Sequence, residues 1–122
     1  MIGLFCRDNP DTDAEAQWYE FVARNGYAAI RLADQEGNIT PLAEDRTIVL
    51  PPNQPAGLDV VCADQSSGGV RLSMSVNDKQ ILETTVTDHP LKEGLAGLQA
   101  WTHPAHDEMD ILWHNFTISS VS

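Results

Sequence analysis

The stretch VRLSMSV, residues 70–76, constrains the fold of this chain more than any other. Its apolar residues occupy every second position: Val70, Leu72, Met74 and Val76. A period of two predicts a β-strand that buries one face and leaves the other in water. Asn77 and Asp78 separate this run from a second extended run, ILETTV, and such a pair is typical of a tight hairpin turn with positive φ.

Similar extended runs fill most of the remaining sequence. They read IGLFCR, GYAAIRLA, NITPLAE, GLDVVCA, GLQAWTH and DILWHNFTIS, and turn-forming residues separate them about every ten residues. Residues 11–26 also fit a helix with an acidic first turn, but Tyr19 and Phe21 alternate with Trp18 and Glu20 as in a strand. About eight or nine short strands therefore predict an all-β protein, an antiparallel β-sandwich or barrel.

Length and charge limit the domain number and the partners. A chain of 122 residues is long enough for one hydrophobic core, so we expect a single domain over residues 1–122. Its 18 acidic and 7 basic residues give a net charge of −11, which argues against nucleic acid and anionic membranes as partners. No run reaches the roughly 20 apolar residues of a membrane span, and the start lacks a secretory signal pattern.

Two cysteines, Cys6 and Cys62, each lie inside an apolar extended run. They do not form a close CxxC pair, so a zinc or redox motif is not predicted. Two interpretations remain open on the residues alone. The cysteines are either buried free thiols or one cross-strand disulfide, which would contribute about 4 kcal/mol in the chain-entropy model.

The order of these runs resembles a known superfamily. The segments GLFCR, WYEFVARNGYAAIRL, GLDVVCA, VRLSMSVNDKQILETTVTD, GLAGLQA and ILWHNFTIS are similar, in sequence order, to the C-terminal two-thirds of a concanavalin A-like lectin/glucanase domain of the laminin-G-like type. Asp78 stands where the family hairpin usually has Gly, and His114 where the last strand usually has Asp. The resemblance implies a jelly-roll β-sandwich and an extracellular or cell-surface protein, in which Cys6 and Cys62 bridge neighbouring strands.

Members of that superfamily carry further strands before the first cysteine strand, and here Met1 precedes it closely. The resemblance therefore implies an N-terminally short sandwich, which is either incomplete or completed by another chain. Uncovered sheet edges and faces are avoided in native proteins by pairing. We accordingly expect a homo-oligomer or a partner chain, and an assembly protein is the alternative function.

The acidic stretch before the first tryptophan partly fits a calcium-loop template. Four oxygen-bearing residues fall at template positions 1, 3, 5 and 7: Asn9, Asp11, Asp13 and Glu15. Glu20 falls at position 12, but Ala14 stands where the template needs Gly. We favour an acidic, solvated hairpin loop, with calcium as the alternative and no other cofactor expected.

No catalytic motif is recognisable. The Glu-x-Asp-x-x-Glu strand of the related glucanases is absent, and so are nucleophile and phosphate-binding motifs, so we expect no enzyme. Histidines and aspartates do cluster near the end of the chain: His103, His106, Asp107, Asp110 and His114. We favour solvated loop residues there, and a metal-dependent glycoside hydrolase is the weaker alternative.

Aromatic and polar residues predict a ligand-binding sheet face. If Tyr19 and Phe21 point into the core, Trp18 and Glu20 point outward, and the same alternation turns Trp101 outward. Because glycans or peptides lie on an exposed sheet face in the superfamily, the candidate site is Trp18, Glu20, Arg31, Gln99, Trp101 and His103. We expect a non-catalytic module that binds a glycan or protein ligand; the other interpretation is that these tryptophans meet a partner chain, while Trp113 and Phe116 belong to the core.

Overall fold

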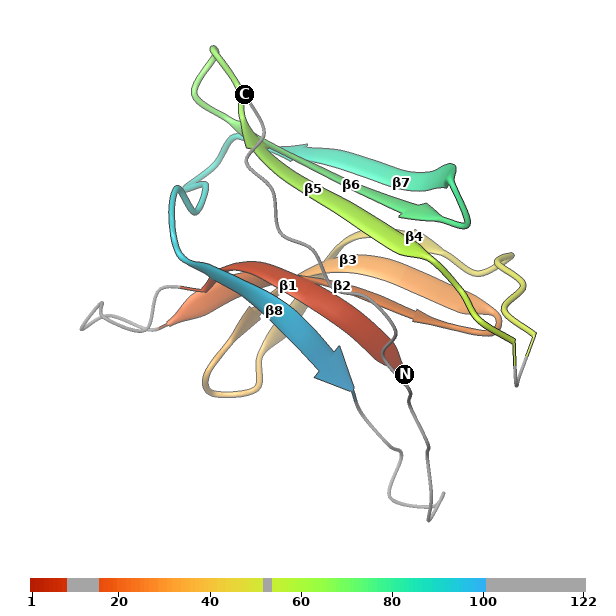
Figure 1. Cartoon of the computed structure of the whole chain (residues 1–122). Coiled ribbons are helices and arrows are strands. Elements are labelled where there is room, and N and C mark those ends of the chain that lie inside the picture. Colours follow the sequence, from red (N-terminus) through yellow and green to blue (C-terminus); the bar gives the residue numbers. More distant parts are fainter. Residues whose placement is uncertain (9–15, 52–53, 101–122) are drawn as a thin grey trace.

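The computed structural model describes residues 1–8, 16–51 and 54–100, and this part of the chain is all-β (Figure 1). Two antiparallel sheets stack on each other, as predicted for a β-sandwich. The strands are β1 (Ile2–Asp8), β2 (Gln17–Arg24), β3 (Tyr27–Asp34), β4 (Ile39–Asp45), β5 (Leu58–Asp64), β6 (Val70–Val76), β7 (Lys79–Val86) and β8 (Leu95–Ala100). Among the described residues, no helix is long and apolar enough to cross a membrane.

The two sheets are built from two successive meanders. One sheet has the order β4-β3-β2-β1-β8 and the other has the order β5-β6-β7. After β7 the chain returns to the first sheet, where β8 pairs with β1. Leu4 of β1 thus lies between Phe21 of β2 and Leu98 of β8. The predicted last strand, DILWHNFTIS, falls outside the described residues, as do Trp113 and Phe116.

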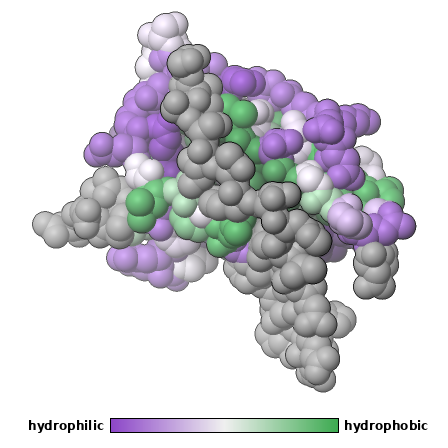
Figure 2. Space-filling view, viewed as in Figure 1, coloured by the Kyte–Doolittle hydropathy of each residue, from purple (hydrophilic) through white to green (hydrophobic). Residues whose placement is uncertain are grey.

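The core lies between the sheets and follows the alternation of the strands. All four apolar residues of β6 are buried, as the period of two predicted, and they pack against Tyr19, Phe21 and Ile30 of the other sheet. In Figure 2 hydrophobic surface gathers between the two layers, and hydrophilic surface dominates over the three-stranded sheet. The segment 17–24 is a strand and not the alternative helix, because each of its residues has a cross-strand partner on β3.

The predicted hairpin turn joins β6 and β7. Asn77 and Asp78 have φ angles of 50° and 68°, the left-handed values that a tight two-residue turn requires. Asn77 also fixes the chain before β5, because its backbone N–H donates to the carbonyl of Gly57 at 2.8 Å and its Oδ1 accepts from the N–H of Gly57 at 2.9 Å. The turn between β6 and β7 is therefore hydrogen-bonded to the residue that precedes β5, and it fixes the start of β5 at this end of the three-stranded sheet.

A disulfide joins Cys6 of β1 to Cys62 of β5, with their Cα atoms 6.8 Å apart. The free-thiol interpretation is therefore wrong, and the bridge connects the two sheets instead of neighbouring strands of one sheet. Both cysteines lie at positions that point into the core, but the sequence does not show to which sheet each of the two strands belongs. Arg7 reinforces the connection, because its guanidinium donates to the carbonyl of Cys62 at 3.2 Å and pairs with Asp64 at 3.1 Å.

Candidate functional site

The candidate site lies on the face of the five-stranded sheet that is turned away from the three-stranded sheet, here called the outer face. Cross-strand partners in an antiparallel sheet point to the same side, so the register defines this face. Glu20 pairs with both Phe5 and Arg31, and Gln99 pairs with Gly3. Four predicted site residues therefore share the outer face: Trp18, Glu20, Arg31 and Gln99. Trp101 and His103 lie outside the described residues.

Two of these residues are not exposed as predicted. Glu20 is 3% exposed and Arg31 is 9% exposed, and their side chains form an ion pair with Oε1 and Nη2 2.5 Å apart. The alternation of β2 shows which residues share a face of the strand, but it does not show how deeply each face is buried. In the middle of β2 both faces are buried, since Val22, on the same face as Glu20, is also inaccessible to solvent. Burying a lone charge is costly, so the opposite charges at these paired positions make that burial possible.

Trp18 is attached to this ion pair. Its indole N–H donates to Oε2 of Glu20 at 3.4 Å, while the ring is only partly buried. The carboxylate of Glu20 thus contacts a guanidinium through one oxygen and an indole through the other. The three side chains form a connected polar group that fixes the orientation of the tryptophan ring on the outer face.

Phe5 adds a second aromatic ring beside Glu20 and is not among the predicted site residues. A Cβ atom at Gly97 would lie 2.6 Å from Cζ of Phe5, so the ring occupies space above β8 that only a glycine leaves open. The signal was available in the sequence, because Phe5 alternates with Leu4 and Cys6 in the same way that Trp18 alternates with Tyr19.

A second cluster lies at the other end of the outer face, also outside the prediction. The Cζ atoms of Arg24 and Arg46 lie 5.3 Å and 5.1 Å from the ring centroid of Tyr27. Arg46 also pairs with Glu44 at 3.3 Å. Burial raises the pKa of the Tyr27 hydroxyl, and its hydrogen bond to Glu44 raises this pKa further. The cluster depends on the register of three strands, which the sequence does not show.

The predicted metal ligands belong to a part of the chain that the structure does not describe. Asn9, Asp11, Asp13 and Glu15 lie in that part, as does the cluster from His103 to His114. Glu20, the residue at the last template position, is held by Arg31 and Trp18 and is not available to a calcium ion. Among the described residues, no three His, Cys, Asp or Glu side chains are placed to hold a metal.

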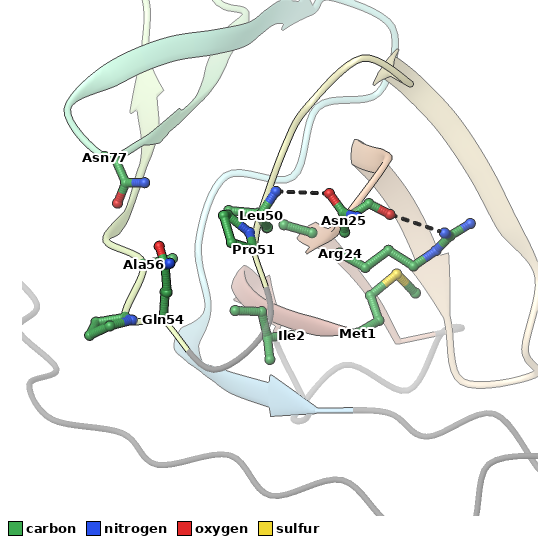
Figure 3. A pocket seen from close by; sticks show the side chains of 11 residues that line it. Met1, Ile2, Arg24, Asn25, Leu50, Pro51, Gln54, Ala56 and Asn77 are labelled. Atoms are coloured by element: carbon green, nitrogen blue, oxygen red, sulfur yellow. Dashed lines mark hydrogen bonds between the residues drawn. The ribbon is translucent and has the colours of Figure 1, made fainter.

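A hollow of about 400 Å³ opens at one end of the sandwich (Figure 3). Its lining is mainly apolar, including Ile2, Leu50, Pro51 and Pro55. Asn25 is engaged within the chain, because its Oδ1 accepts from the N–H of Leu50 at 3.0 Å and its carbonyl accepts from Arg24 at 3.4 Å. No acidic residue, histidine, cysteine or serine is among the described residues that line it.

The chain was compared with protein-family models, with curated proteins and with solved structures, and no match was found in any of the three comparisons.

Proposed function

We propose that this protein is a non-catalytic binding module that holds a glycan on the outer face of its five-stranded sheet. The observation that carries the proposal is the partly buried Trp18, whose indole is oriented by the buried Glu20–Arg31 pair. A partly exposed aromatic ring on a sheet offers apolar area to the C–H face of a sugar, and neighbouring polar groups can hydrogen-bond to its hydroxyls. Gln99 lies on the same face, two strands away from Trp18.

The carboxylates of the outer face support binding and not hydrolysis. Glycosidases need two carboxyl groups that flank the scissile bond, one of them free to give up a proton. Among the described residues of this face, Glu20 is buried against Arg31 and Glu44 is paired with Arg46. Both acids are thus engaged with arginines, which leaves neither of them free to flank a scissile bond.

The disulfide and the resemblance to concanavalin A-like modules support an extracellular or cell-surface location for this activity. Disulfides form and persist in oxidising compartments, and the Cys6–Cys62 bridge lies between the two sheets. We therefore propose that the ligand is a glycan met outside the cytoplasm. A protein ligand on the same face is the other outcome of the experiment below.

Tryptophan fluorescence titrated with a panel of oligosaccharides tests the proposal. We expect at least one glycan to quench the emission, and Trp18→Ala to weaken its binding at least tenfold while the far-UV circular dichroism is unchanged. Val49→Ala is the matched control, because Val49 is an exposed apolar residue outside the strands. The proposal fails if no glycan binds or if Trp18→Ala binds as well as the unaltered chain.

Association is a second candidate function, which two exposed side chains favour. Ile39 and Leu95 are exposed large hydrophobic residues on β4 and β8, the two outermost strands of the described five-stranded sheet. Apolar groups on edge strands favour pairing between chains. Native mass spectrometry that shows a dimer or a larger assembly, dispersed by Leu95→Lys, would support this function.

A further inference from the structure

Trp18 has an exposed aliphatic neighbour on the outer face, Ile39 of β4. The register pairs Trp18 with Ala33 and Ala33 with Ile39, so the three residues form one row across β2, β3 and β4. Cross-strand partners in an antiparallel sheet point to the same side, so Ile39 shares the outer face with Trp18. Ile39 is 49% exposed and Trp18 is partly exposed, whereas Ala33 is buried. Trp18 and Ile39 are therefore the side chains of this row that a ligand can contact.

The spacing between these two side chains suits a single sugar. Trp18 and Ile39 lie two strands apart, which corresponds to about 10 Å between their backbones. The single methyl group of Ala33 is too short to separate them. A sugar ring that stacks on Trp18 can therefore place one of its substituents against Ile39, and both contacts belong to the same sugar.

Ile39 sets the polarity of that substituent. Its side chain has no donor or acceptor, so a sugar hydroxyl laid against it would lose hydrogen bonds to water without replacement. A methyl group in the same place is favourable, because apolar surface leaves water on both sides of the contact. The substituent over Ile39 is therefore apolar.

The charges near this row favour a neutral sugar. The turn between β3 and β4, which leads into Ile39, carries the carboxylates of Asp34 and Glu36. In the next row of the outer face, Arg31 is buried in its ion pair with Glu20. An acidic sugar would thus meet two like charges, and the arginine of the neighbouring row is already engaged.

The edge of β4 is poorly suited to pairing with a strand of another chain. Pro41, two residues after Ile39, has no backbone N–H to donate. The register between β3 and β4 also shifts between Ile30 and Arg31, the cross-strand partner of Pro41. The exposed side chain of Ile39 therefore suits a ligand on the face better than a strand added at the edge.

We infer that the glycan of the outer face presents a neutral sugar with a methyl-bearing substituent, which stacks its ring on Trp18 and lays the methyl group against Ile39. The substituent is an N-acetyl group or the methyl group of a 6-deoxy sugar, since both carry a methyl group and no charge. This inference rests on the proposed glycan binding and adds the chemical class of the sugar and the residue that selects it.

Tryptophan fluorescence and saturation-transfer NMR with four matched probes test the inference: glucose, N-acetylglucosamine, 6-deoxyglucose and glucuronic acid, and the same four sugars of the galactose series. We expect a methyl-bearing sugar to bind about fourfold tighter than its parent, the factor that corresponds to burying one methyl group. Ile39→Thr should remove this advantage without changing the binding of the parent sugar. Val49→Thr is the matched control, because Val49 is an exposed aliphatic residue outside the strands. The probe that responds to Ile39→Thr distinguishes the N-acetyl group from the 6-deoxy group.

The outcomes separate this inference from the proposed function. Equal affinity for parent and methyl-bearing sugars, with Trp18→Ala weakening both, overturns the inference and leaves glycan binding in place. A preference that Ile39→Thr does not reduce, or tightest binding of the uronic acid, has the same meaning. Binding of an oligosaccharide alone, unaffected by Ile39→Thr, also overturns the inference.

Two further results bear on the occupant of this face. Native mass spectrometry that shows an assembly dispersed by Ile39→Thr would assign Ile39 to a contact between chains and would overturn the inference. The absence of binding to any sugar or oligosaccharide would overturn both this inference and the proposed function.

Discussion

The carboxylate of Glu20 and the guanidinium of Arg31 lie at directly opposed positions of β2 and β3, 2.5 Å apart and almost entirely buried. Such a pair is not a strong source of stability, because removing two charges from water costs about as much as their attraction returns. Its structural effect is on geometry: the second carboxylate oxygen holds the indole of Trp18. The pair thus links the buried middle of the sheet to the partly exposed ring.

Replacing only one member of this ion pair should lower the free energy of unfolding far more than replacing both members. We expect Glu20→Leu and Arg31→Met each to lower the free energy of unfolding by about 3–5 kcal/mol, because each removes one partner of a buried ion pair and leaves the other charge in the protein interior. The double replacement Glu20→Leu with Arg31→Met should lie within about 1–2 kcal/mol of the original chain. Urea unfolding of the four proteins measures this coupling, and strictly additive effects would contradict it.

Reduction of the disulfide should weaken the fold substantially. The bridge closes a loop between residues 56 positions apart, and the chain-entropy model then gives a stabilisation of about 4 kcal/mol. We expect the urea midpoint to fall in the presence of a phosphine reductant. A Cys6→Ala, Cys62→Ala double variant should already have the lower midpoint and should not respond to the reductant; an unchanged midpoint in the original chain would refute the expectation.

The turn between β3 and β4 should make stability depend on pH in the acidic range. The carboxylate of Asp34 accepts hydrogen bonds from the side chain and the backbone N–H of Asn38, and these lower its pKa below the ordinary value of 3.8. The folded chain therefore binds a proton less readily than the unfolded chain. The resulting stabilisation is complete above pH 3.8 and is lost as the pH falls through the lower folded pKa.

An Asp34→Ala variant should accordingly be less stable than the original chain at pH 7, and the two stabilities should converge below the folded pKa. Thermal unfolding followed from pH 7 down to about pH 2 measures the difference. Asp59→Ala serves as the control, since Asp59 is exposed on β5 and its carboxylate makes no hydrogen bond to a described residue. A difference that stayed constant with pH would exclude this account of Asp34.

In the β6–β7 turn, glycine at position 78 should make the fold at least as stable as the natural aspartate does. Asp78 has a φ of 68°, and a side chain with a Cβ pays about 1–2 kcal/mol for this left-handed backbone. We expect Asp78→Gly to be at least as stable as the original chain and about 1 kcal/mol more stable than Asp78→Ala. Chemical denaturation of the two variants compares them, and a more stable alanine variant would mean that the turn has changed its type.

The sequence predicted the strands and turns well because these depend on local patterns. The alternation of Val70, Leu72 and Met74 shows which side is buried, and Asn77-Asp78 is a turn for reasons contained in the two residues. What it could not predict depends on pairing at long range. The burial of Glu20 requires knowledge of its neighbours on β1 and β3, and the partner sheet of Cys62 requires the topology.

The candidate site shows the same division. Trp18 and Glu20 were assigned to the correct side of β2 by alternation, and the error concerned only how deeply Glu20 lies. The Arg24–Tyr27–Arg46 cluster was not predicted at all, since Arg46 reaches the ring of Tyr27 only after β4 has folded back beside β3. Contacts of this kind have no signature in a single sequence.

The position of β1 between β2 and β8 sets the order in which the chain can fold as it is synthesised. β1 and β2 can pair as soon as the ribosome has released them, but the partner of Leu4 on the other side, Leu98, emerges more than ninety residues later. Until then one edge of β1 has no partner strand among the described ones, and unpaired edges invite contacts with other chains. The nascent protein therefore completes its larger sheet late, and pairing at such long sequence separation makes this a slow step of folding.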